Sequence, residues 1–247
     1  QYPVIDWDHA YHLIEGREVS NPRPVWEKHI HNLLGPYTCG SISYSDGAHD
    51  DVNKIIWSAL DWDPSSEARD IVLDYARYFA GEEYAERFAE GIFALEKNWE
   101  GPLAENKSVE ETLRHWQAME AQAPHQLQAN WRFQLGLFRA YLDAYVRRRS
   151  LADMKTEEAA YAQLRKAKQE GPDAALEGAR KLLAESRKRP AAADLRRKVE
   201  ALAEARIPLL VDWGKRHWSE ALRGWPAIQQ VCESLPQLPL IVLREGI

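Results

Sequence analysis

Residues 37–64, YTCGSISYSDGAHDDVNKIIWSALDWDP, contain the change of pattern around which the rest of the chain is organised. The first part, 37–44, is a run of apolar and small residues rich in β-formers, which favours a strand buried on both faces. A polar, acid-rich loop follows, and apolar residues at spacings of three and four then predict an amphipathic helix over 50–60. Asp50 or Asp51 is placed to cap that helix. We therefore expect a junction between a strand-containing unit and a helical one.

Helical patterns dominate the chain on both sides of this junction. Pro24 suits the first turn of a helix that runs to Leu34. Asp63 and Pro64 have the types of a cap and a first helical residue, so a helix is expected from there to residue 80, with Trp62 packed at the break before it. Further helices are predicted over 83–99, 108–123, 127–149, 156–169, 173–188 and 191–206. The expected fold is mainly α: a helical bundle domain with a short α/β segment at the N-terminus.

Local signals add detail to these helices. Ser108 and Glu111 have the spacing of a capping box. Tyr78 and Trp99 fall on the apolar stripes of their helices, which predicts that both rings are buried. The run Arg147–Arg149 places three cations where a helix is predicted to end, and there they would complement the helix dipole. A phosphate or nucleic-acid patch is the alternative interpretation of that run.

The composition changes along the chain and suggests four parts. Residues 1–62 are the α/β segment, and 63–150 form an aromatic-rich helical domain. Residues 151–206 are rich in Ala, Lys, Arg and Glu, which is typical of helical hairpins. Residues 207–247 contain four prolines and an apolar run near the end, and carry no structural prediction.

The overall composition excludes several classes of function. The 247 residues are 45% hydrophobic and 28% charged, with a net charge of −6, so electrostatics do not favour nucleic acid. No apolar run is long enough to span a membrane. Two cysteines are too few for a disulfide framework or a zinc site, and we expect no cofactor. The chain starts at Gln1 without an initiator Met, so we expect a processed protein, an excised piece or a fragment.

The loop after the predicted strand carries the candidate substrate-binding residues. They are Tyr44, Asp46, His49 and Asp50 in the loop, and Asn53 in the helix that follows. Ligands bind where strands of barrels and open sheets end, and carboxylates accept hydrogen bonds from sugar hydroxyls. The alternative is a solvated acidic loop that caps a helix. No catalytic residue is identified, because polar groups this close in one loop rarely supply an opposed acid and base.

The histidines do not indicate a metal site. His29 and His31 are two residues apart on a predicted helix and therefore point to different faces. His9 and His12 have a ligating spacing, but no Cys or acid completes a recognisable set. Motifs for nucleophilic hydrolases, phosphate loops and dinucleotide binding are absent from the sequence. We therefore expect no metal.

One arrangement resembles a known class of enzymes. Trp62-Asp63-Pro64, followed by the aromatic run from Asp74 to Phe79, resembles the last barrel strand and helix and the following helical domain of bacterial glycoside hydrolases. The similar groups are the α-glucuronidases and β-N-acetylglucosaminidases, and the resemblance covers about residues 1–150. It implies carbohydrate binding, hydrolase activity and a secreted or periplasmic location. Because most barrel strands are missing, it also implies that the catalytic acid lies outside this chain.

Two functions remain open at this point. The first is the C-terminal portion of a carbohydrate-active enzyme, which contributes a substrate-side loop and a helical domain. It predicts that the strand over 37–44 exposes its apolar faces or is covered by self-association or by the missing barrel portion. The second is a stand-alone helical binding or scaffold protein, in which 37–44 is a minor connector.

Overall fold

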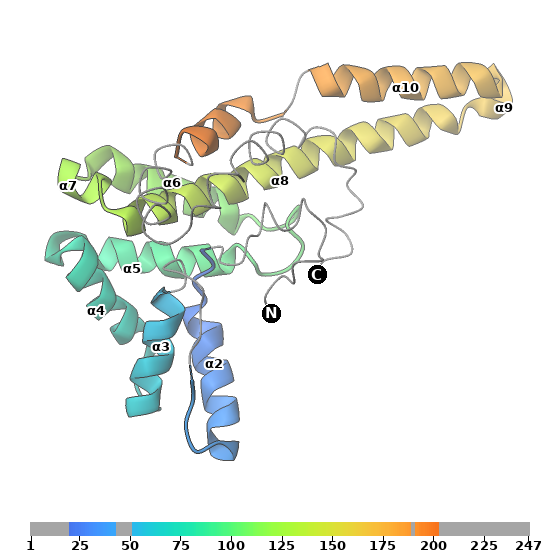
Figure 1. Cartoon of the computed structure of the whole chain (residues 1–247). Coiled ribbons are helices and arrows are strands. Elements are labelled where there is room, and N and C mark those ends of the chain that lie inside the picture. The colour runs from blue at the N-terminus through green and yellow to red at the C-terminus, as the bar shows by residue number, and fades with distance from the viewer. Residues whose placement is uncertain (1–19, 43–50, 189–190, 203–247) are drawn as a thin grey trace, which may run out of the picture. The chain divides into compact units, whose positions relative to one another are not determined.

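The computed structural model describes residues 20–42, 51–188 and 191–202, and within these ranges the regular structure is helical (Figure 1). The prediction of a mainly α fold is confirmed. The chain divides into two compact units, Gln1–Asp143 and Ala144–Ile247, so the boundary falls inside one long helix.

The first unit is a stack of short helices in chain order. It contains α2 (Pro24–Leu34), the 3-10 helix η1 (Gly35–Tyr37), α3 (Asp51–Trp62), α4 (Ala68–Ala80), α5 (Glu82–Lys97), α6 (Ser108–Gln122), α7 (His125–Gln128) and the first part of α8 (Trp131–Leu164). Neighbours in sequence pack on one another: α2 on α3, α3 on α4, α4 on α5 and α5 on α6. The bounds predicted for α2 are confirmed, since Pro24 is its first residue and Gly35 follows its last.

The second unit is built from longer, more polar helices. It contains the remainder of α8, then α9 (Ala167–Glu170), α10 (Pro172–Lys188) and a helical segment over 193–202. Gly171 has a φ of 88° and ends α9, so the chain turns there before Pro172 opens α10.

Trp116 is the central side chain of the first unit. It is fully buried, and its indole N–H donates to the carbonyl of Gly91 at 3.2 Å. A Cβ on Gly136 would lie 2.0 Å from the indole ring, so only glycine leaves room for it there. The rings of Phe88 and Phe133 lie 5.6 and 5.8 Å from that of Trp116, at tilted angles that suit aromatic pairs. This cluster joins α5, α6 and the start of α8.

The strand predicted for 37–44 is wrong over its described residues. Tyr37 belongs to η1, and residues 38–42 are neither strand nor helix. Two causes are visible. Gly35 and Pro36 continue α2 as a tight turn, and no strand among the described residues offers the backbone partners that a ladder requires. Residues 43 and 44 lie outside the described ranges.

The start of α4 also differs from the prediction. The helix begins at Ala68, because the Asp63 carboxylate accepts the amide and hydroxyl of Ser65 at 2.9 and 2.7 Å and so forms a turn instead of a cap. Trp62 is 92% exposed and is not packed at the break. It follows the buried Leu60 by two residues, which places it about 200° round the helix from the core.

The prediction that the Tyr78 and Trp99 rings are buried is wrong for Tyr78 and only partly correct for Trp99. Tyr78 is 82% exposed, although it follows the buried Ile71 by seven residues, because it lies in the last turn of α4. Trp99 is half exposed and lies after the end of α5, with the Arg139 guanidinium 4.4 Å from its ring centre.

Two helix ends were wrongly placed from sequence. Ser108 is the first residue of α6 and not its cap, since the Asn106 side chain accepts the Ser108 amide at 2.9 Å. α8 does not end at residue 149. It continues to Leu164 because no Gly or Pro occurs between Gly136 and Gly171. Arg147–Arg149 therefore lie within a helix and do not cap its dipole.

Replacing Gly136 with Ala tests the central packing. A mid-helix Gly→Ala change normally stabilises by up to about 1 kcal/mol. Here we expect a loss of about 2 kcal/mol or more, because the added methyl group meets the Trp116 ring. Urea unfolding measures the difference. Gly35→Ala is the matched control, since Gly35 has a helical φ of −47° and open space around it. Equal stability of the two variants would contradict the packing described above.

Candidate functional site

The N-terminus of α2 is held by a carboxylate from α5. Glu96 is buried, and its two oxygens accept the amides of Val25 and Trp26 at 3.1 and 2.9 Å. These are amides of the first helical turn, which have no partner inside the helix. Burial raises the pKa of Glu96, while the two amide hydrogen bonds act in the opposite direction. The direction of α2 is therefore fixed by a side chain about 70 residues away in the sequence.

Asn53 fixes α3 beside the start of α2. Its amide nitrogen donates to the Asn21 carbonyl at 2.9 Å, and its oxygen accepts the Arg23 amide at 2.8 Å. Asn53 is buried, and this pair of backbone contacts explains why an amide occupies that position. A second link joins the same helices, because the Trp57 indole donates to Glu27 at 2.7 Å. Substrate binding by Asn53 stays a prediction. In the structure, Asn53 holds the start of α2 beside α3.

The other end of the helix pair is closed by three side chains. His31 Nε2 lies 3.0 Å from Asp61 Oδ1, and the Ser41 hydroxyl donates to the other Asp61 oxygen at 2.6 Å. The bonds from Ser41 and His31 lower the pKa of Asp61. Asn32 directs its oxygen at His31 Nδ1, because its nitrogen donates to the Pro64 carbonyl at 3.1 Å. Residue 41 is thus tied to the C-terminal end of α3.

Asp51 is anchored at the opposite end of α3. Its carboxylate accepts the Tyr75 hydroxyl at 3.0 Å and pairs with Arg132 Nε at 2.6 Å. The Arg132 guanidinium lies between two rings, 3.6 Å from the centre of Phe79 and 4.0 Å from that of Trp131. Burial and the Asp51 charge raise the pKa of Tyr75. Asp51 was expected as a possible cap, but the structure uses its charge to join α3, α4 and α8.

Together these contacts fix both ends of the candidate loop. Ser41 is held at Asp61, and Asp51 is held by Arg132, so the two anchors are separated by most of α3, about 15 Å. The loop residues Tyr44, Asp46, His49 and Asp50 lie outside the described ranges. The structure therefore defines where the loop starts and ends.

Sequence reasoning missed most of this frame. Glu96 and Arg132 are positioned on surfaces that contact α2 and α3, but their partners are about 70 and 81 residues away. No periodicity or spacing links residues at that separation. The sequence offered only two local signals. Glu96 is an acid beside the apolar stripe of its predicted helix, and Arg132 is next to aromatic residues.

Other kinds of site find little support in the described residues. No group of three or more potential metal ligands is found in these ranges, and none of the helices there could cross a membrane. A pocket of about 240 Å³ lies at the loop between α5 and α6. Its lining residues Asn106 and Ser108 are already engaged with each other and with backbone carbonyls. Comparisons with protein-family models, curated proteins and solved structures found no match.

The pH dependence of stability tests the buried state of Glu96. A pKa raised above the ordinary 4.5 means that the folded protein binds the proton more tightly than the unfolded chain. The resulting stability is fully present below pH 4.5 and is lost as the pH rises through the folded pKa. We therefore expect the unfolding free energy of the wild type, relative to Glu96→Gln, to fall between pH 4.5 and 7. Glu90→Gln, at an exposed position of the same helix, should show no such slope.

A double-mutant cycle on Asp51 and Arg132 tests the anchor of the loop. The pair is mostly buried, so Asp51→Asn and Arg132→Gln should show a coupling energy of about 1 to 2 kcal/mol in urea unfolding. Asp74 and Arg77 form an exposed pair and should couple by less than about 0.5 kcal/mol. Additive effects at Asp51 and Arg132 would show that this contact does not hold α3.

Proposed function

We propose that the first unit presents the loop over 44–50 to carbohydrate, as part of a glycoside hydrolase-like enzyme whose catalytic acid lies elsewhere. The observation that supports this is the pinning of both loop ends, at Ser41 and at Asp51. A ligand loop whose ends are already fixed loses less conformational entropy on binding. A polar, acid-rich segment held in this way is suited to repeated hydrogen bonding with sugar hydroxyls.

Within the loop, each residue type has a plausible sugar contact. Asp46 would accept hydrogen bonds from hydroxyl groups, with His49 and Asp50 beside it. The ring of Tyr44 offers an apolar surface against which a sugar ring can pack. In this proposal these residues bind and orient the substrate, and none of them acts as the acid or the nucleophile.

The buried carboxyls of the described residues support a catalytic acid located elsewhere. Glu96 is used by α2, as described above. Asp143 is buried, accepts the Asn98 amide at 2.8 Å and pairs with Arg139 at 2.8 Å. Burial raises the pKa of Asp143, with Arg139 and Asn98 opposing that effect. Glu27, the third buried carboxyl, accepts hydrogen bonds from the Trp57 indole and the Arg23 guanidinium at 2.7 and 2.8 Å. All three carboxyls have structural partners, and a glycosidase needs a pair of carboxyls that flank the scissile bond.

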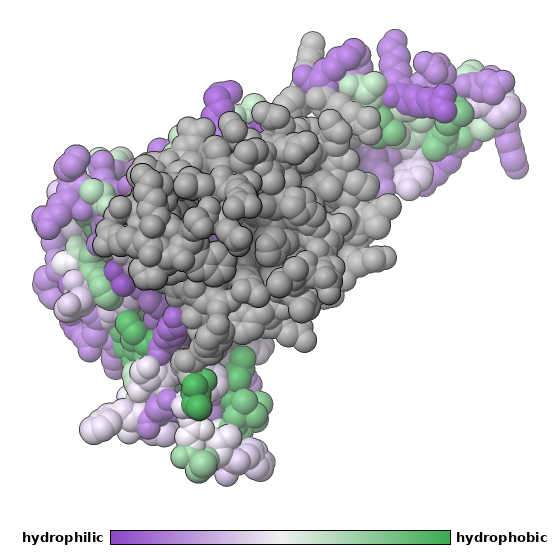
Figure 2. Space-filling view, viewed as in Figure 1, coloured by the Kyte–Doolittle hydropathy of each residue, from purple (hydrophilic) through white to green (hydrophobic). Residues whose placement is uncertain are grey.

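The second candidate is a helical binding or scaffold protein, and the two faces of α2 favour it. The inner face buries the polar residues Glu27 and His31. The outer face exposes Trp26 and Leu33 by 54 and 59%, and Tyr37 of the following η1 is 86% exposed. Figure 2 shows hydrophobic side chains at the surface over this part of the molecule. A helix that carries large apolar residues on its solvent face is typical of a surface covered by another body. In the enzyme, that body would be the rest of the catalytic domain.

Sugar binding by an Asp46→Ala variant tests the first function. Titration calorimetry against N-acetylglucosamine, glucuronate and their oligosaccharides should show binding by the wild type and at least tenfold weaker binding by the variant. The melting temperature should stay unchanged, because Asp46 is proposed to contact ligand only. Asp70→Ala, at an exposed acid on α4, is the matched control and should bind as the wild type does.

Hydrogen exchange separates the two functions on the same protein. Protection of residues 43–50 by a sugar supports the carbohydrate function. A wild type that binds none of these sugars contradicts it and leaves the binding or scaffold function. Asp46→Ala with a lowered melting temperature and unaltered binding would show that Asp46 has a structural role.

A further inference from the structure

The second unit contains a helical hairpin whose interior is lined by small residues. The last part of α8 and α10 run side by side in opposite directions (Figure 1). Ala160, Ala175 and Ala179 are buried between them, and a Cβ on Gly178 would lie 2.7 Å from the Gln163 side chain. The helices therefore approach closely, but their contact buries mainly methyl groups. Such a seam contributes little hydrophobic stabilisation compared with a seam of leucines.

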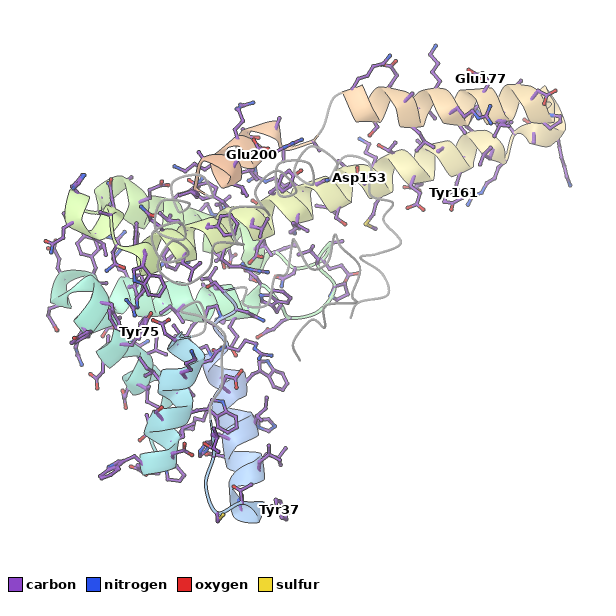
Figure 3. All side chains as sticks on the ribbon, viewed as in Figure 1. Tyr37, Tyr75, Asp153, Tyr161, Glu177 and Glu200 are labelled. Carbon is purple, nitrogen blue, oxygen red and sulfur yellow. The ribbon has the colours of Figure 1, made fainter. Side chains whose placement is uncertain are left out.

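Four large apolar side chains of the hairpin lie on one flank instead, whereas Leu182, 40% exposed, follows Ala175 by seven residues and lies on the seam side of α10. Tyr161 and Leu164 on α8, and Leu176 and Leu183 on α10, are 38 to 53% exposed. We call these four residues the hairpin face. Figure 3 labels Tyr161 beside α8, and Figure 2 shows hydrophobic side chains grouped on the hairpin.

Helix geometry explains why the four residues of the hairpin face lie on the same side of the hairpin. Leu176 and Leu183 are seven residues apart and share a direction, about a quarter turn from the buried Ala175. Tyr161 and Leu164 are displaced in the same rotational sense from the buried side of α8. Because the two helices are antiparallel, equal rotational displacement brings both pairs to the same flank of the hairpin.

We propose that the hairpin face pairs with the same face of a second copy of this chain, in antiparallel orientation, to form a four-helix bundle. Two helices joined by an alanine seam lack the layers of larger side chains that stabilise a bundle. A second hairpin supplies such layers. The proposal goes beyond the carbohydrate function and does not depend on it.

The charges of the hairpin favour a second copy as the occupant. α10 carries Asp173 and Glu177 in its first half and Arg180, Lys181 and Lys188 in its second half. A copy laid antiparallel on it brings acids opposite cations, whereas a parallel copy opposes like charges. Glu185 departs from the pattern, but it is paired with Lys188 at 2.8 Å.

α8 also separates its charges along its length, but in the reverse order. Arg147, Arg148 and Arg149 precede Glu157 and Glu158 along this helix. Lys155 is the exception. Because charges of opposite sign lie toward opposite ends of each helix, either helix of a second hairpin can lie antiparallel on its own counterpart with unlike charges opposed.

The sequence of residues 203–247 has no stretch free of proline and glycine that is as long as α10. Residues 203–247 are interrupted by Pro208, Gly214, Gly224, Pro226, Pro236 and Pro239. Within this segment, the stretches between those residues are shorter than the 17 residues of α10. A partner that follows both helices needs a length comparable to theirs, which the second hairpin has by symmetry.

Sedimentation velocity over about a hundredfold range of protein concentration tests this proposal. The wild type should dimerise as the concentration rises. Leu176→Glu/Leu183→Glu should raise the dimer dissociation constant at least tenfold, with an unchanged helical signal by circular dichroism. Ala174→Glu is the matched control, because it adds the same charge on the opposite flank of α10, and it should dimerise as the wild type does.

A charge exchange gives a second test in case the double leucine variant fails to fold. Arg180→Glu should weaken the dimer, since it places acids opposite acids in the antiparallel pair. Adding Glu177→Arg should restore dimerisation, which a loss of helix stability alone would not do. A wild type that stays monomeric throughout overturns the proposal. So does a dimer that persists in Leu176→Glu/Leu183→Glu, since the interface must then lie on another surface.

Discussion

The buried carboxylate of Glu96 at the N-terminus of α2 is the contact on which the candidate site depends. A helix end buried without partners for its first amides is unstable, so α2 can lie against α5 only if a side chain supplies the acceptors. Once α2 is fixed, Asn53 and Glu27 set α3 beside it. The loop ends then follow from the position of α3. The other contacts around the candidate loop thus depend on one hydrogen-bond acceptor, the Glu96 carboxylate.

This frame has an unusual distribution of polarity. The hydrogen bonds that join α2 to α3 link partly buried polar groups, whereas the outer face of α2 is apolar and exposed. Polar seams specify a precise geometry because every donor must meet its acceptor. Apolar outer faces provide affinity without such precision. The combination fits an element that must hold a loop accurately on one side while another body packs on the other.

The two units solve the packing problem differently. In the first unit a buried tryptophan, seated against Gly91 and Gly136, fills the space between three helices. In the hairpin of the second unit, α8 and α10 meet through alanines, and the four residues of the hairpin face remain partly exposed. The first arrangement is complete within one chain. The second leaves apolar area uncovered, and pairing with a second copy would bury it.

Local sequence patterns were enough to predict the mainly α class, the helix of Pro24–Leu34 and the approximate positions of most other helices. Those features depend on local rules: apolar spacing, proline at first turns and glycine at ends. Local rules failed where partners decide the outcome. The β-rich run over 37–42 has no strand to pair with among the residues that the structure describes, and Trp62 lies on the wrong side of its helix to be buried. Only the tertiary structure joined Asp51 to Arg132 and Glu96 to α2, because pairs about 70 to 81 residues apart leave no periodic trace in the sequence.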